Sequence, residues 1–331
     1  MTARPEIIAR RFTLAAFALC LVVVVLGAYV RLSNAGLGCP DWPGCYGHFT
    51  PATAGIADHE SLGKAWKEMV HRYAAGTVGL LIVVLAALAI HWRGRRLLNL
   101  PLSIALLMIV VVQGLFGMLT VTWQLTPLVV TLHLLFGLTT LSLLWWQLLS
   151  LLRRQHGAWG MQTIYRGAGL RHACHIALIG LIALAVQIAL GGWTSSNYAA
   201  VACPDLPTCQ GSWWPEADFR DAFVLWRGLG VNYQGGVLEQ LARVAIHFTH
   251  RLGALVATLA LLWAAFSVLR ARTDRVARGS AIAVLAALAL QLLIGVSMVK
   301  FGFPLWLATA HNAGAALLLL SVIALNRSLR P

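Results

Sequence analysis

Eight long runs of apolar residues, separated by short polar segments, dominate the pattern of the chain. Each run has roughly the 20 residues that an α-helix needs to cross the hydrocarbon core of a bilayer. The first run is long for a signal peptide and no small-residue cleavage site follows it, so we interpret it as a retained helix. The pattern predicts an all-α integral membrane protein with eight transmembrane helices, at about 12–32, 69–91, 99–121, 127–150, 173–195, 240–268, 277–299 and 304–326.

The composition and the charge pattern agree with a bilayer as the solvent. Of the 331 residues, 59% are hydrophobic and 11% are charged, against about 25% charged in a typical soluble protein. The formal net charge of +14 would suit a nucleic-acid partner, but the arginines gather at alternate ends of the apolar runs. The positive-inside rule then places these clusters and both termini in the cytoplasm, with membrane lipid and not nucleic acid as the partner. The clusters include Arg10 and Arg11; Arg93, Arg95 and Arg96; Arg153, Arg154, Arg166 and Arg171; Arg270, Arg272, Arg275 and Arg278; and Arg327 and Arg330.

An internal repeat divides the chain into two similar halves. Four crossings per half return the chain to the same side of the membrane, so the halves would be four-helix bundles related by a pseudo-twofold axis along the membrane normal. The predicted organisation is an N-terminal half (1–150), a cytoplasmic linker (151–172) and a C-terminal half (173–331). The aligned segments are GAYVRLSNAGLGC (27–39) with GGWTSSNYAAVAC (191–203), MVHRYAAGTVGLL (69–81) with FTHRLGALVATLA (248–260), QGLFGMLTV (113–121) with QLLIGVSMV (291–299), and TLHLLFG (131–137) with TAHNAGA (309–315).

Four histidines lie inside apolar runs, near the outer ends of alternate helices: His71, His133, His250 and His311. Ionisable side chains within a membrane span are costly and usually functional. The two histidines of each half lie at similar depth, so they can meet in the bundle core. Imidazoles that face each other across a bundle suit the axial positions of a haem iron, and two matched pairs predict two haem sites.

Two alternative roles for these histidines stay open. A histidine in a core is often hydrogen-bonded to a backbone carbonyl, and for a single histidine we would favour that role. A zinc site is the other alternative, but neither pair has a cysteine or carboxylate beside it to complete four ligands. The recurrence of the pair in both halves favours haem.

Charged residues beside the histidines suggest further roles. Arg72 and Arg251 each follow a candidate ligand directly, where a guanidinium would pair with a haem propionate or extend to the lipid headgroups. Glu68 lies one helical turn before His71 on the same face, whereas the second half has His247 at that position. A buried glutamate would have a raised pKa and suit proton transfer; an interfacial glutamate stabilised by the helix dipole is the alternative.

Two short cysteine motifs of equal spacing fall in the predicted outer loops: CPDWPGC at 39–45 and CPDLPTC at 203–209. We call them the first and second clasp. Two prolines in a five-residue gap turn the chain back, which makes a disulfide within each clasp geometrically plausible, and the outer compartment is oxidising. A four-thiolate zinc site would require the two loops to meet, and thioredoxin-type chemistry usually uses a two-residue gap.

The motifs GAYVRLSNAGLGCPDWPGCYG, EMVHR, TLH, HFTHRLGAL and TAHNAGA, together with the second clasp, resemble those of the haem A synthase family over nearly the whole chain. The resemblance implies a bacterial inner-membrane enzyme that oxidises the C8 methyl group of haem O to a formyl group by successive hydroxylations, which supplies haem A to terminal oxidases. It also implies haem O synthase and terminal oxidase assembly factors as partners, and the sequence allows a homo-oligomer.

The resemblance assigns roles within each half. It implies that the first half holds the substrate haem and carries out catalysis, and that the second half holds a resident haem b that passes electrons. The clasps would be disulfides that cover the two haem pockets. The residues concerned are Glu68, His71 and His133 for catalysis; His250, His311, Arg72 and Arg251 for cofactor binding; and the disulfide pairs Cys39 with Cys45 and Cys203 with Cys209.

Two other function classes fit the same sequence less well. A diheme b-type cytochrome that relays electrons from quinol would use the same histidines and would produce no altered haem. A transporter would share the repeat, but every aspartate lies in a predicted loop, which leaves no acidic pair within the membrane to couple ions. We therefore rank the cytochrome second and transport third.

Overall fold

The computed structural model describes residues 3–56, 58–95, 97–155, 168–271 and 273–330. These residues form long helices joined by irregular loops, and their only β-type pairing is two isolated bridges. Eight of the helices are long and apolar enough to cross a bilayer, as the apolar runs predict. Their bounds are α1 Ala3–Leu32, α2 His59–His91, α3 Leu100–Thr122, α4 Pro127–Gln155, α5 Ala168–Ser196, α7 Gln240–Arg270, α8 Arg275–Lys300 and α9 Leu305–Ser328; the shorter elements are η1 Pro51–Thr53, η2 Arg93–Arg95 and α6 Phe219–Ala222.

Several helices extend beyond the apolar runs that predict them. Helix α2 begins at His59 and not near residue 69, because Asp58 caps its first turn and accepts hydrogen bonds from the backbone N–H groups of Glu60 and Ser61. Such a cap satisfies amide donors that have no partner within the helix. Apolarity alone marks only the part of a helix that the bilayer covers, so it misses the polar first turns of α2.

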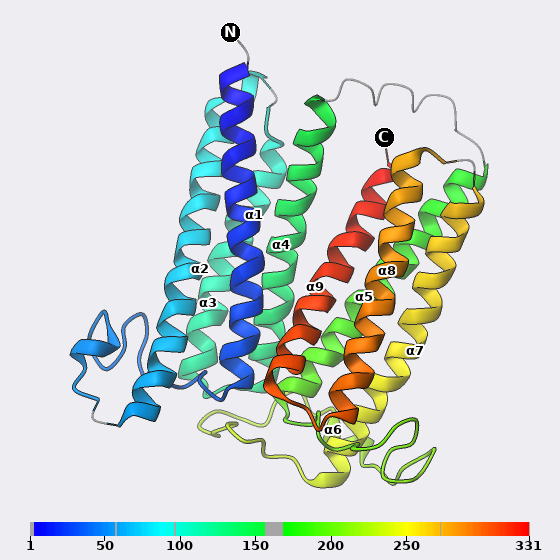
Figure 1. The fold of residues 1–331 in the computed structure, drawn as a ribbon. Helices are drawn as coiled ribbons and strands as arrows, with labels where there is room; N and C mark the ends of the chain where they lie inside the picture. The colour runs from blue at the N-terminus through cyan, green and yellow to red at the C-terminus, as the bar shows by residue number, and fades with distance from the viewer. Residues whose placement is uncertain (1–2, 57, 96, 156–167, 272, 331) are drawn as a thin grey trace. The chain divides into compact units, whose positions relative to one another are not determined.

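The chain folds into two compact units, each of which contains four long helices. In the first unit α1 packs on α2 and α2 packs on α3 (Figure 1). Helices α3 and α4 meet through the stacked rings of Phe116 and Phe136, 5.3 Å apart. The rings of Phe17 and Trp145, 5.0 Å apart, join α4 back to α1. The four helices therefore close into a bundle.

The second unit closes in the same way. Helix α8 packs between α7 and α9, and the side-chain amide of Asn326 in α9 donates to the carbonyl of Ala177 in α5 at 3.0 Å. Helices α5 and α7 approach closely at Gly180, where an added Cβ would lie 3.3 Å from side-chain atoms of Leu261 and Ala264. Small residues at a contact allow such close packing between membrane helices, where lipid removes the hydrophobic driving force.

Neither unit is a single continuous segment of the chain. The first comprises residues 1–148, 195–198 and 223–239, and the second comprises 149–194, 199–222 and 240–331. The segment 223–239 comes from the long loop between α5 and α7, yet it belongs to the first unit. Its Tyr233 is buried and donates its backbone N–H to the carbonyl of Gln124 at 3.1 Å. The division at a 151–172 linker stays a prediction, and residues 156–167 of that linker lie outside the described residues.

Candidate functional site

The four candidate histidines lie on four different helices and form two pairs. In the first unit His71 of α2 and His133 of α4 are close enough for their charges to interact. In the second unit His250 of α7 and His311 of α9 interact in the same way. The two candidate ligands of each pair therefore lie on different helices of one unit.

Each of these imidazoles packs against a glycine on the preceding long helix. A Cβ added to Gly27 would lie 2.8 Å from Cε1 of His71, and one added to Gly191 would lie 3.1 Å from Cε1 of His250. The corresponding distances are 3.4 Å from Gly117 to His133 and 3.1 Å from Gly295 to His311. The absence of a side chain at these four positions leaves the space that the rings occupy. The repeat alignment pairs Gly27 with Gly191 but gives no sign of this contact.

Sequence reasoning also missed three glutamines that reach the histidines from the neighbouring helix. Gln113, Gln187 and Gln291 each donate from Nε2 to the backbone carbonyl of a histidine, with distances of 2.9 Å to His133, 3.0 Å to His250 and 3.1 Å to His311. The alignment of QGLFGMLTV with QLLIGVSMV already places two of them at equivalent positions. A polar residue that recurs at one position of a repeated apolar helix is the signal that would have found them.

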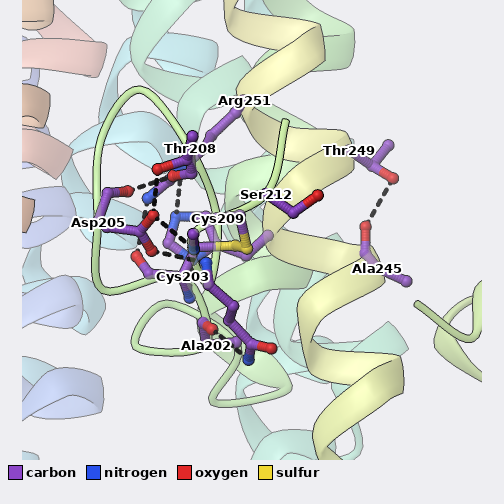
Figure 2. The surroundings of a disulfide bond; sticks show 12 residues. Ala202, Cys203, Asp205, Thr208, Cys209, Ser212, Ala245, Thr249 and Arg251 are labelled. Atoms are coloured by element: carbon purple, nitrogen blue, oxygen red, sulfur yellow. Dashed lines mark hydrogen bonds between the residues drawn. A yellow bond between two sulfur atoms is a disulfide. The ribbon is translucent and has the colours of Figure 1, made fainter. Parts of the chain in front are cut away.

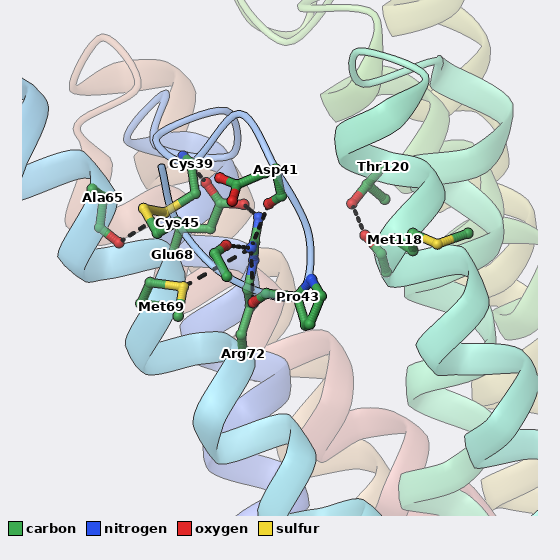
Figure 3. Close-up of polar contacts among 12 residues, drawn as sticks. Cys39, Asp41, Pro43, Cys45, Ala65, Glu68, Met69, Arg72, Met118 and Thr120 are labelled. Carbon is green, nitrogen blue, oxygen red and sulfur yellow. Dashed lines mark hydrogen bonds and ion pairs between the residues drawn. A yellow bond between two sulfur atoms is a disulfide. The ribbon is translucent and has the colours of Figure 1, made fainter. Parts of the chain in front are cut away.

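Both clasps are closed by the expected disulfides, Cys39 with Cys45 and Cys203 with Cys209 (Figures 2 and 3). The prediction of a disulfide within each clasp is therefore confirmed. The first disulfide packs on Ala65 and Met69 of α2 and forms a small apolar cluster with them. The second is part of a corresponding cluster with Ala202 and Val244. Each clasp thus covers the first turns of the helix that carries a candidate ligand.

Glu68 and Arg72 attach the first clasp to α2 (Figure 3). The carboxylate of Glu68 is buried, and it accepts the backbone N–H of Cys39 at 2.9 Å and a guanidinium N–H of Arg72 at 2.5 Å. Arg72 also donates to the carbonyls of Asp41 and Gly44, at 2.8 and 2.6 Å. Arg72 lies four residues after Glu68, so the two side chains share one face of the helix. The ion pair therefore attaches helix and loop to each other.

The second clasp has the same attachment without a carboxylate (Figure 2). Nδ1 of His247 lies 3.3 Å from the backbone nitrogen of Cys203, and its Nε2 lies 3.3 Å from Nε of Arg251. Arg251 donates to the carbonyls of Cys203, Asp205 and Thr208, each at 2.8 Å. Glu68 and His247 thus occupy the same place between clasp and arginine. They differ in charge and in capacity, because a carboxylate accepts both hydrogen bonds whereas a neutral imidazole accepts at one ring nitrogen only. The pairing of either arginine with a haem propionate stays a prediction.

An aspartate organises the turn within each clasp. Asp205 accepts the hydroxyl of Thr208 and the backbone N–H groups of Gly211 and Gln210, and Asp41 accepts two N–H groups in the first clasp. The bonds from Thr208 and Gly211 lower the pKa of Asp205 to about 2. Since this pKa is depressed on folding, its stabilising contribution is present above pH about 4, the unfolded value, and is lost as the pH falls through about 2. The turn is fully formed at neutral pH.

The donor set at each pair suits haem better than zinc. Among the residues that the structure describes, no group of three or more histidine, cysteine, aspartate or glutamate side chains could hold a metal ion. A protein zinc site needs at least three such ligands, whereas a haem iron has four porphyrin nitrogens and needs only two axial ligands. Two partly buried imidazoles, with space kept for their rings by the facing glycines, meet that need. The residues present therefore fit a haem in each unit.

Comparison with known proteins agrees with this donor set. Residues 10–323 match the model of the cytochrome oxidase assembly protein family. A haem A synthase of Shewanella oneidensis is 41% identical over 316 residues, which cover 92% of each chain. This chain belongs to the haem A synthase family. Haem A synthases of Shouchella clausii and Listeria monocytogenes are 27% and 26% identical, over 83% and 89% of this chain. As a member of that family with eight membrane-length helices, it is a multi-pass membrane protein.

We expect alanine at Gly27 to weaken haem binding in the first unit and to leave the second unit unchanged. The added Cβ would lie 2.8 Å from Cε1 of His71, and an imidazole fixed by an iron cannot turn aside as a free one can. Overpacking of this kind typically costs about 1–3 kcal/mol. Haem content of the purified variant, measured as pyridine haemochrome, would report the loss.

The matched control is alanine at Gly114 of α3, where an added Cβ meets no atom within 4 Å. G114A should keep the wild-type haem content. Equal haem content in G27A and G114A would contradict a role for this packing in holding His71.

Proposed function

We propose that the chain is a haem A synthase that oxidises the C8 methyl group of haem O to a formyl group by successive hydroxylations. The substrate haem binds between His71 and His133 in the first unit. A resident haem b binds between His250 and His311 in the second unit and, when bound, supplies one-electron transfer. The observation that carries this proposal is the convergence of two imidazole pairs, one in each bundle, in a chain of this family.

The first unit has the features that substrate oxidation requires of the protein. Its two imidazoles come from helices that are joined through α3 and α1, and this bundle would hold both on a haem bound between them. The first clasp packs on Ala65 and Met69 of α2, where it would help to enclose a haem held by His71. An enclosed site prevents a reactive centre from reacting with solvent.

Glu68 is the residue that best explains why only the first unit would act on a substrate. It lies one turn from His71, is buried and ion-paired with Arg72, and carries a negative charge where the second unit has His247. A carboxylate that bonds to Arg72 and to the N–H of Cys39 is positioned to accept or release a proton as the substrate is oxidised. In the second unit His247 takes its place, and a site that only passes electrons needs no such proton acceptor.

The arginine distribution supports an orientation in a bacterial inner membrane, with both termini in the cytoplasm and both clasps on the outer face. Disulfides persist in that outer, oxidising compartment. We place the substrate supply with a haem O synthase and the delivery of haem A with the assembly factors of a terminal oxidase. The lipid bilayer surrounds the apolar faces of the helices, which expose large side chains such as Leu80, Val111 and Leu293.

Co-expression with a haem O-producing enzyme, followed by chromatography of the extracted haems, tests the proposed function. We expect a peak of haem A or of its hydroxylated intermediate, which is absent when this chain is omitted. A diheme cytochrome would yield haem b with haem O unchanged. That result, in cells shown to contain the haem-loaded protein, would refute the proposal.

A further inference from the structure

The histidines differ in how their neighbouring helix supports them. Three of the four preceding helices carry a glutamine four residues before the glycine that faces the imidazole: Gln113 before Gly117, Gln187 before Gly191, and Gln291 before Gly295. In α1 the corresponding position, four residues before Gly27, is Val23. His71 is thus the one candidate ligand whose facing helix has no glutamine at this position.

The three glutamines contact both the backbone and the ring of their histidines. Besides the bond to the histidine carbonyl, Nε2 of Gln187 lies 3.1 Å from Nδ1 of His250, and Nε2 of Gln291 lies 3.3 Å from either ring nitrogen of His311. The amide of Gln113 lies 3.5 Å from Nε2 of His133. Each amide therefore connects the helix that carries the ligand to its neighbour and limits rotation of the ring.

These amides also offer an acceptor. The Oε1 atoms of all three glutamines are buried and have no hydrogen-bond partner in the described part of the chain. An imidazole that binds iron through one nitrogen carries a proton on the other, and metal-bound histidines almost always donate that proton to a nearby acceptor. A glutamine side chain turned so that Oε1 faces the ring would supply it. Nδ1 of His71 and Nδ1 of His133 are both buried without a partner among the described residues, but the helix that faces His133 carries Gln113, whereas the helix that faces His71 has a valine at this position.

The helices that carry the histidines differ in a way that matches the presence or absence of the glutamine. A glycine follows three of the histidines by three or four residues and leaves space for the amide: an added Cβ on Gly253 or Gly314 would lie 2.3 Å from the glutamine Oε1, and one on Gly137 would lie 3.1 Å from Nε2. After His71 the residues at these offsets are Ala74 and Ala75. At His71 the facing helix lacks the glutamine, and the histidine's own helix lacks the glycine. A chance replacement of one residue would have changed only one of the two.

We propose that Val23 makes His71 the exchangeable ligand of the substrate haem, and that Gln113, Gln187 and Gln291 act as positioning residues that hold the other three histidines on their irons. This inference rests on the proposed function. It assigns the two ligands of the substrate haem to different tasks. His133 would hold the haem throughout, whereas His71 would be the residue that releases it.

Carbon monoxide binding to the reduced, haem-loaded protein tests the assignment without any turnover. At saturating carbon monoxide, the rate of binding to a six-coordinate haem is set by the departure of a histidine. In the wild type we expect a fast phase from the first unit and a slow phase from the second. V23Q/A74G, which introduces the missing amide and the space for it, should slow the fast phase by about ten-fold, the lower end of outer-shell effects on metal sites.

Two matched variants separate the hydrogen bond from side-chain bulk. V23M/A74G adds a side chain of similar length that cannot accept a hydrogen bond of comparable strength, so it should keep the wild-type fast phase. Q291M removes the amide from the second unit and should accelerate the slow phase by about ten-fold. Equal rates in V23Q/A74G and V23M/A74G at wild-type haem content, or an unchanged slow phase in Q291M, would overturn the inference.

The outcomes also distinguish this inference from the proposed function. If V23Q/A74G does not assemble with haem, Q291M and the corresponding Q187M decide the matter alone. A wild-type protein that holds no haem in its first unit would refute the proposed function itself. A protein with both haems and no response to the glutamine exchanges would refute only the exchangeable ligand.

Discussion

Replacement of His71 by alanine is expected to abolish the formation of haem A while the haem of the second unit remains. His71 supplies one of only two imidazoles in the first unit's pair, and loss of even an outer-shell partner typically lowers metal affinity or activity about 10–100-fold. The yield of haem A should therefore fall by at least about 100-fold. Chromatography of extracted haems measures the yield, and the low-spin spectrum of the purified protein reports the remaining haem b.

The matched control is alanine at His311, the corresponding ligand of the second unit. H311A should lose the haem b spectrum and should still retain haem O in its first unit, although turnover stops for lack of electrons. The two variants therefore differ in which haem they lose. Haem A at the wild-type yield in H71A would show that the first unit is not the substrate site.

Histidine in place of Glu68 is expected to keep the protein folded and haem-loaded but to stop catalysis. The second unit shows that a histidine at this position fits between the first cysteine of its clasp and the arginine, with a ring nitrogen 3.3 Å from each. A neutral imidazole accepts at one of these nitrogens, so E68H should preserve one of the two hydrogen bonds that attach the first clasp. If the carboxylate transfers a proton during oxidation, turnover should fall about 100-fold or more, the usual contribution of general acid–base catalysis.

Leucine at the same position provides the contrasting variant. Both substitutions remove the counter-charge of Arg72, whose side chain is 12% exposed beside a Glu68 side chain that is 6% exposed, but only E68L also removes every hydrogen-bond acceptor at this position. Breaking a buried ion pair typically costs about 3–5 kcal/mol, so thermal unfolding should shift downward, and further in E68L than in E68H. Wild-type activity in E68H would show that Glu68 has only the attachment role that His247 has.

The sequence was sufficient for the helices, the disulfides and the placing of two candidate histidines in each unit. Apolar length identifies a membrane span almost independently of tertiary packing, and the spacing of Cys39 and Cys45 restricts them to a local bond. The pairing of His71 with His133 followed from their depth in two helices that start on the same side. Each of these features depends on local pattern or on simple geometry.

The contacts of the charged residues could not be predicted in the same way. Arg72 follows His71 directly, which suggests a shared site, but successive residues point about 100° apart around a helix. Arg72 instead shares a face with Glu68, four residues earlier, and reaches the carbonyls of the first clasp. The partners of Glu68 and Arg72 include backbone groups of a loop, and no side-chain pattern encodes those.

Because residues 223–239 belong to the first unit, a cut between α4 and α5 does not separate the two units. A chain severed between α4 and α5 gives an N-terminal fragment without the segment that contributes Tyr233 and the Trp226 ring, which lies 5.3 Å from Trp123. That fragment exposes an apolar surface which the intact chain covers. The N-terminal half of the sequence is therefore not a self-sufficient piece, because part of its unit comes from a loop that follows α5.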